Sequence, residues 1–188
     1  MFKKQYIPNI LTGLRLSAVP FFVGAYFLLP SVTGAYVALA IFLLASVTDW
    51  FDGYLARKWQ AESAWGKCFD PIADKALIIT ALFMVVWQEG QVVLPAIVIT
   101  LREVIVSGLR IYVAAAHGQL NVSHLAKVKT ICQMVAISVF IIIPALPLDM
   151  ALWLLDGPAI LLMWVAAILT GISGLGYLRK SLSYLKKP

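Results

Sequence analysis

Six long apolar stretches constrain the fold of this sequence more than any other feature. They cover about residues 8–29, 35–56, 68–88, 92–115, 126–147 and 155–177, and short polar breaks separate them. A helix of roughly 20 apolar residues is long enough to cross a bilayer. Hydrophobic residues make up 62% of the chain and charged residues 13%, which excludes soluble, disordered and disulfide-based proteins. We therefore expect an all-α polytopic membrane protein with six transmembrane helices, forming one domain over residues 1–188.

The net charge of +6 predicts membrane topology and not nucleic-acid binding, because the basic residues gather at particular breaks. The breaks after the first, third and fifth apolar stretches contain no Lys or Arg. The N-terminus, the C-terminal tail and the second break are basic, and basic residues flank the fourth break. Cytoplasmic segments of membrane proteins carry such an excess of Lys and Arg. We expect both termini in the cytoplasm, with residues 2–15 beginning as an interfacial segment.

Four aspartates fall within 26 residues of a chain that has only nine acidic residues, namely Asp49, Asp52, Asp70 and Asp74. An Asp at the middle of a transmembrane helix costs roughly 2.5–3.5 kcal/mol, so this group needs compensation. Residues three or four apart share a helix face, and the short break at 57–67 predicts two antiparallel neighbouring helices. Four converging carboxylates favour hard divalent cations, Mg²⁺ or Mn²⁺, bound as a pair.

The residues between the two acidic pairs are suited to a phosphate group. Gly53, Ala56 and Gly66 have little side-chain bulk, so a ligand or a neighbouring helix can approach the backbone. Arg57 offers a guanidinium fork to a phosphate or a carboxylate. The alternative is a purely structural network in which the acids pair with nearby basic residues, namely Arg57, Lys58, Lys67 and Lys75.

This region resembles the signature of the CDP-alcohol phosphatidyltransferase family: Asp49-Trp-Phe-Asp52-Gly53-Tyr-Leu-Ala56-Arg57, eight residues, then Gly66-Lys-Cys-Phe-Asp70-Pro-Ile-Ala-Asp74. Every fixed position of the signature is filled at the family's spacing. The resemblance implies a six-helix membrane enzyme, usually a homodimer, that uses two divalent cations. It implies that the four aspartates are metal ligands and that Asp74 is also the catalytic base. It further implies contacts with the cytidine diphosphate head from Gly53, Arg57, Ser63, Asn9 and Thr12.

A second group of charged residues follows in the fourth and fifth apolar stretches. Arg102 lies near mid-span, where an unpaired guanidinium is tolerated only in a polar cavity. Arg102 and Glu103 are adjacent and are expected not to face each other, so each needs a partner elsewhere. A pocket formed by Arg102, Arg110, Lys127 and Lys129 beside the aspartates would suit an acceptor that bears a phosphate. The alternative is that the last three are basic residues snorkelling at the membrane surface.

Three further segments resemble the branch of the family that makes phosphatidylglycerophosphate. They are Asn9-Ile-Leu-Thr12-Gly-Leu-Arg15, Arg102-Glu103 with Leu109-Arg110, and Lys127-Val-Lys129-Thr130. This resemblance implies transfer of phosphatidyl from CDP-diacylglycerol to sn-glycerol 3-phosphate, with release of CMP. We expect the site to face the cytoplasm from a bacterial inner membrane, in contact with membrane lipid. The alternatives are a sibling enzyme that uses inositol phosphate, serine or phosphatidylglycerol, and a divalent-cation transporter.

Three glycines in the last apolar stretch, Gly171, Gly174 and Gly176, are expected to be close-packing positions against another helix.

Overall fold

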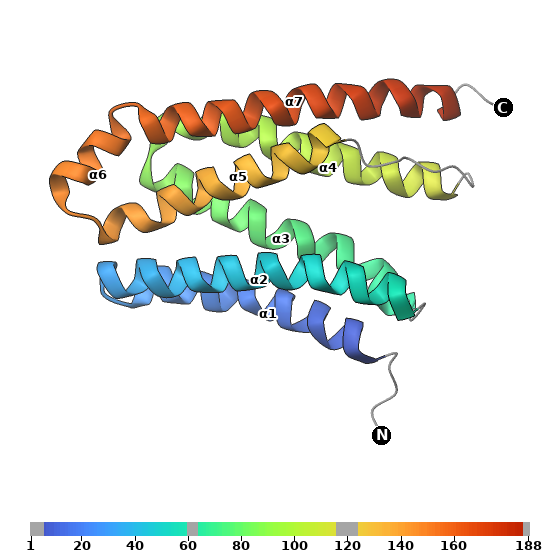
Figure 1. Cartoon of the computed structure of the whole chain (residues 1–188), viewed down its shortest axis with the longest axis horizontal. Coiled ribbons are helices and arrows are strands. Elements are labelled where there is room, and N and C mark those ends of the chain that lie inside the picture. Colours follow the sequence, from blue (N-terminus) through green and yellow to red (C-terminus); the bar gives the residue numbers. More distant parts are fainter. Residues whose placement is uncertain (1–5, 60–63, 116–123, 186–188) are drawn as a thin grey trace. The chain divides into compact units, whose positions relative to one another are not determined.

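A computed structural model of the chain describes residues 6–59, 64–115 and 124–185, with side chains at 12–48, 72, 75–114 and 125–182. These residues are helical apart from short turns, and no strand occurs among them, so the all-α prediction is confirmed there (Figure 1). The helices are α1 (Tyr6–Leu28), α2 (Ser31–Trp59), α3 (Ala64–Gln88), α4 (Val93–Ala115), α5 (His124–Ile142), α6 (Leu148–Leu155) and α7 (Pro158–Leu185). Two 3₁₀ turns, η1 (Gly90–Val92) and η2 (Ile143–Ala145), precede α4 and α6.

Apolar helices coincide with all six predicted stretches. In the described part of the chain, four segments are long and apolar enough to cross a membrane: Ser31–Thr48, Gly90–Ala114, Leu125–Ala145 and Leu148–Leu182. Two shorter apolar segments, Thr12–Leu28 and Lys75–Gln88, belong to α1 and α3. The membrane character is therefore confirmed, whereas the count of six crossings stays a prediction.

The first compact unit of the chain, residues 1–81 with 141–147, contains the hairpin of α1 and α2. The two helices run antiparallel after a tight turn in which the Gly34 amide donates to the Pro30 carbonyl at 2.7 Å (Figure 1). A Cβ atom at Gly34 would lie 2.7 Å from the Ala25 carbonyl oxygen, so only glycine permits this approach. Phe22 and Phe42 pack across the pair, with ring centroids 6.2 Å apart.

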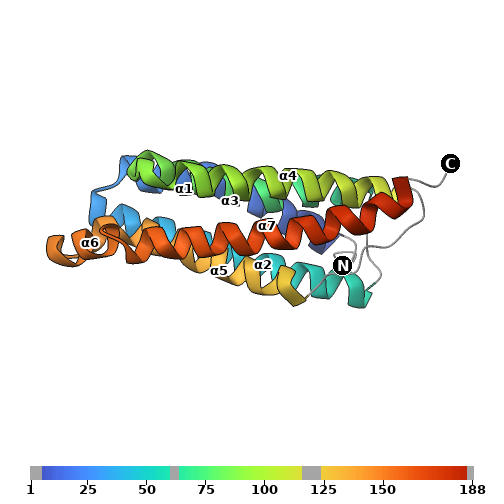
Figure 2. The ribbon, with the colours of Figure 1, turned by 90° about the horizontal axis from the view of Figure 1, so that it is seen from above.

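The second compact unit, residues 82–140 with 148–188, is organised around α4 and α7. These two helices run side by side in the same direction (Figure 1 and Figure 2). A Cβ atom at Gly174 would lie 2.8 Å from Cγ of Arg102, and one at Gly171 would lie 4.0 Å from Val98. Close packing is therefore confirmed at Gly174 and is looser at Gly171. The prediction of close packing is wrong for Gly176, where an added Cβ meets nothing within 4 Å.

In the middle of α4, two charged residues are buried and several apolar residues are exposed. Arg102 and Glu103 are 9% and 3% exposed, whereas Leu101, Val104 and Ile105 are each more than half exposed. A surface helix in water has the reverse pattern, because charged side chains are almost never fully buried there. This arrangement suits a helix whose outer face contacts lipid and whose ionisable residues face the protein interior.

One local prediction differs from the structure. The break expected between the apolar stretches 126–147 and 155–177 contains α6 (Leu148–Leu155), which is apolar apart from Asp149 in its first turn, where a negative charge suits the helix dipole. Residues 6–15 of the expected interfacial segment form the start of α1, which continues unbroken to Leu28, and the interfacial position of this segment stays a prediction.

Candidate active site

The four aspartates of the signature lie on two long helices, in the part of each helix that belongs to the first unit. Asp49 and Asp52 fall within about three turns of the end of α2, and Asp70 and Asp74 within about three turns of the start of α3. Each helix is continuous through its pair, so spacings of three and four put each pair on one face. The side chains of these aspartates, and those of Asn9, Ala56 and Arg57, are outside the described set, as are the surroundings of Gly53 and Gly66. Ser63 lies outside the described residues.

The connection between α2 and α3 limits how far apart the two pairs can be. Only residues 60–63 separate Trp59 from Ala64, and such a segment spans at most roughly 18 Å. Asp52 lies seven residues before the end of α2 and Asp70 six residues after the start of α3, so each is about 10 Å of helix from the connection. The backbone therefore holds both pairs at matching distances from the ends of two consecutive helices.

No other group of acids competes with these four in the part of the chain that has described side chains. There, His, Cys, Asp and Glu form no group of three that could hold a metal ion, and the four aspartates fall outside that search.

On α1, Thr12 and Arg15 are buried at 2% and 4% exposure, three residues apart on one helix face. Asn9 precedes Thr12 by the same spacing, so a polar face runs along an otherwise apolar helix.

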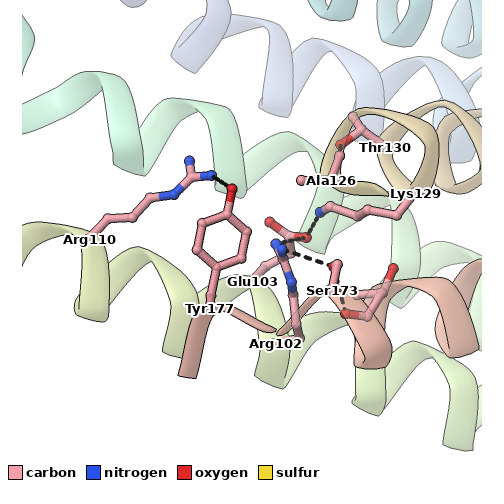
Figure 3. A network of polar contacts seen from close by, with 9 residues as sticks. Arg102, Glu103, Arg110, Ala126, Lys129, Thr130, Ser173 and Tyr177 are labelled. Atoms are coloured by element: carbon pink, nitrogen blue, oxygen red, sulfur yellow. Dashed lines mark hydrogen bonds and ion pairs between the residues drawn. The ribbon is translucent and has the colours of Figure 1, made fainter. Parts of the chain in front are cut away.

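In the second unit, a carboxylate lies between two cations in the interior of the protein (Figure 3). Glu103 Oε1 accepts a hydrogen bond from Arg102 Nη1 at 3.2 Å and another from Lys129 Nζ of α5. Arg102 Nη2 also donates to Ser173 Oγ of α7, at 3.1 Å. We call Arg102, Glu103, Lys129 and Ser173 the ion cluster; all four are buried.

The ion cluster corrects one sequence-based expectation and confirms another. Arg102 and Glu103 do contact each other, because the long arginine side chain reaches the neighbouring carboxylate despite the diverging Cβ directions. The expectation that each residue has a partner elsewhere is confirmed by Ser173 for Arg102 and by Lys129 for Glu103. Removing one partner of such a buried ion pair costs about 3–5 kcal/mol, so the cluster links α4, α5 and α7 strongly.

Arg110 lies two turns beyond Arg102 on α4 and contacts a tyrosine of α7 (Figure 3). Its Nη2 donates to the Tyr177 hydroxyl at 2.9 Å, and its guanidinium carbon lies 4.9 Å from the ring centroid. The guanidinium carbon of Arg102 lies 5.5 Å from the same centroid. Arg110 and Lys127 are exposed residues, unlike Arg102 and Lys129. The four predicted acceptor-binding residues thus divide into an exposed pair and a buried pair.

Sequence analysis did not single out Ser173 or Tyr177. Both lie on α7, four residues apart and therefore on one face, next to Gly174 at its contact with α4. The sequence feature that could have pointed to this face is the pair of polar residues Thr170 and Ser173 in an apolar helix. Buried polar residues in membrane helices bind partners on other helices.

Comparison with known proteins identifies the family. A model of the CDP-alcohol phosphatidyltransferase family matches residues 5–172. A protein of Cereibacter sphaeroides is 38% identical, over 96% of this chain and 97% of its own length. A Rickettsia felis protein is 39% identical over 95% and 96% of the two chains, and an Escherichia coli protein 40% identical over 92% of each. All three are named "CDP-diacylglycerol--glycerol-3-phosphate 3-phosphatidyltransferase". The chain belongs to the CDP-alcohol phosphatidyltransferase family.

Proposed function

We propose that this protein transfers the phosphatidyl group of CDP-diacylglycerol to sn-glycerol 3-phosphate, giving phosphatidylglycerophosphate and CMP. The observation that carries this proposal is the complete signature from Asp49 to Asp74. Its two pairs of aspartates lie on α2 and α3, which are separated by only four residues. The relatives that bear this activity in their names support the proposal, because the matches cover more than nine-tenths of both chains. Helices α2 and α3 are continuous through the aspartates, which does not favour a transporter with discontinuous helices.

The donor set fits two divalent cations. Asp49, Asp52, Asp70 and Asp74 are hard oxygen ligands, paired on two helix faces at matching distances from one connection. We propose that these four residues hold Mg²⁺ or Mn²⁺. When bound, the cations would neutralise the diphosphate and the charge that develops on the leaving oxygen.

The residues of the chain account for the remaining chemistry of the proposed transfer. Asp74 takes the proton of the acceptor hydroxyl while that oxygen forms its bond to the phosphorus attached to diacylglycerol. The bond from this phosphorus to the oxygen of CMP breaks, and CMP leaves with the negative charge. Arg57 binds the diphosphate through its guanidinium fork, and the small residues Gly53, Ala56 and Gly66 give it access to the backbone. Asn9, Thr12 and Ser63 contact the cytidine diphosphate head.

We assign binding of the acceptor's phosphate group to four basic side chains of the second unit. Arg110 and Lys127 are exposed residues and bind the phosphate directly in this proposal. The buried Arg102 and Lys129, which Glu103 engages, contribute positive potential behind them. A phosphate dianion needs such a concentration of charge more than serine or another neutral acceptor does, which favours a phosphorylated acceptor such as glycerol 3-phosphate.

We also propose six membrane crossings in one catalytic domain of residues 1–188. Helices α1 and α3 have 23 and 25 residues. At 1.5 Å per residue each is about 35 Å long or more, and the hydrocarbon core is about 30 Å thick. The basic N-terminus and C-terminal tail support a cytoplasmic location for both ends and for the active site, in a bacterial inner membrane. In this proposal the start of α1 lies at the interface, and the resemblance supports a homodimer.

The test uses purified protein in detergent with CDP-diacylglycerol, Mg²⁺ or Mn²⁺, and a panel of acceptors. We expect CMP release with glycerol 3-phosphate and none with serine, inositol phosphate or phosphatidylglycerol. Arg110→Ala should raise the acceptor KM about tenfold or more and leave the KM of the lipid unchanged. Arg179→Ala, which removes an exposed arginine of α7, is the matched control. CMP release with a different acceptor alone would assign the protein to a sibling activity, and release with none would refute the transfer.

A further inference from the structure

Tyr177 contacts a cation that the proposed function places in the acceptor site. We propose that Tyr177 is a positioning residue, which holds the guanidinium of Arg110 in place to receive the phosphate of the acceptor. This inference rests on the proposed function, since it assigns a role to a residue behind the proposed phosphate ligand. The geometry behind it is the hydrogen bond of 2.9 Å from Arg110 Nη2 to the Tyr177 hydroxyl (Figure 3).

The tyrosine is itself held rigidly by three helices. It is 3% exposed and forms a buried cluster with Val106 of α4 and Ala126 of α5. Arg102, which Glu103 and Ser173 hold in place, lies within cation–π distance of the ring at 5.5 Å. The hydroxyl is therefore a fixed acceptor, whereas Arg110 belongs to the exposed residues of the same helix.

The contact leaves most of the arginine available to a ligand. A guanidinium has five N–H donors, and among the described residues Tyr177 takes one of those of Arg110. The ring also attracts the cation, with the guanidinium carbon 4.9 Å from the centroid. An exposed arginine loses much rotamer freedom when it binds a phosphate. Because Tyr177 restricts that freedom beforehand, it should lower the acceptor KM without affecting the lipid substrate.

The first test is Tyr177→Phe, which keeps the buried ring and removes only the hydroxyl. We expect the KM of glycerol 3-phosphate to rise about three- to tenfold, with kcat and the KM of CDP-diacylglycerol changed less than twofold. The same substitution in an Arg110→Ala background should have no further effect. Tyr112→Phe is the matched control, because it removes an exposed hydroxyl two residues from Arg110. An unchanged acceptor KM, or an equal rise for both substrates, would overturn the positioning role.

A second measurement separates this inference from the proposed function. Phenylglyoxal modifies exposed arginine guanidinium groups, and peptide mass spectrometry can follow Arg110 individually. We expect Arg110 to react several-fold faster in Tyr177→Phe than in the wild type, and at the wild-type rate in Tyr112→Phe. Equal rates in all three would refute the hold of Tyr177 on Arg110, even if the transferase is fully active. A wild type that releases no CMP with glycerol 3-phosphate would instead refute the proposed function, and the acceptor role of Tyr177 with it.

Discussion

Two regions of this apolar chain concentrate charge, and they do so in opposite ways. The aspartate region has two pairs of aspartates at helical spacing, Asp49 and Asp52 on α2 and Asp70 and Asp74 on α3. The ion cluster joins one buried carboxylate to Arg102 and Lys129, so that the chain supplies its own counterions. In the proposal the group of acids takes positive charge from bound cations, whereas a buried carboxylate that two basic residues engage can stabilise the fold without a ligand.

This contrast predicts where each kind of substitution acts. Like charges at helical spacings of three or four repel each other, so removing one acid of the aspartate region should not destabilise the protein. Removing Glu103 should do so, because it leaves buried cations without their shared acceptor. Substitutions in the aspartate region should therefore act mainly on turnover, and those in the ion cluster mainly on stability.

The largest expected effect is that of Asp74→Asn. The change should lower kcat for CMP release about a thousandfold or more, because an amide cannot take the proton of the acceptor hydroxyl. Without added cation, the melting temperature in detergent should stay the same or rise slightly, because one of several like charges is removed. Asp149→Asn on α6, at an exposed residue, is the control for turnover and should leave kcat unchanged. Full activity of Asp74→Asn would exclude this residue as the base.

Removal of divalent cations should act on the same region. EDTA should abolish CMP release, and added Mg²⁺ or Mn²⁺ should restore it, because in the proposal the four aspartates hold the cations. Added cation should also raise the melting temperature of the wild type, since a ligand that binds only the folded state stabilises it. The double variant Asp49→Asn/Asp70→Asn should lose this rise, and a rise that persists would place the bound cation elsewhere.

Glu103→Leu should have the next largest effect, and on stability. We expect the free energy of unfolding to fall by about 3–5 kcal/mol, because two buried cations lose their carboxylate. Thermal or denaturant unfolding in detergent measures the loss, with Asp156→Asn at an exposed position as the control. Adding Lys129→Met should recover part of this loss, because it removes one of the two buried positive charges that Glu103 engages. A stable Glu103→Leu protein with no turnover would reverse the comparison of the two regions.

The same contrast explains how much the sequence alone could predict. The aspartate region is contiguous, so its spacing on helices was predictable, and the family it indicates is confirmed. The ion cluster joins residues far apart in the sequence: Lys129 is 26 residues from Glu103, and Ser173 is 71 from Arg102. The helical periodicity of the sequence cannot predict such pairs, because they depend on which helices pack together. Helix α6 was missed for another reason, since its eight residues are too few for a membrane-span pattern.

The smallest expected effect tests the packing that places the ion cluster. A Cβ atom at Gly174 would lie 2.8 Å from Cγ of Arg102, whose guanidinium is tied to Ser173 and Glu103 and cannot move away freely. Gly174→Ala should therefore lower the free energy of unfolding by about 1–3 kcal/mol. At Gly176 nothing lies within 4 Å, so alanine there should be neutral or stabilise by up to about 1 kcal/mol through helix propensity. Melting temperatures of the two variants measure the difference, and equal shifts would mean that the cluster does not depend on the close approach of α4 and α7.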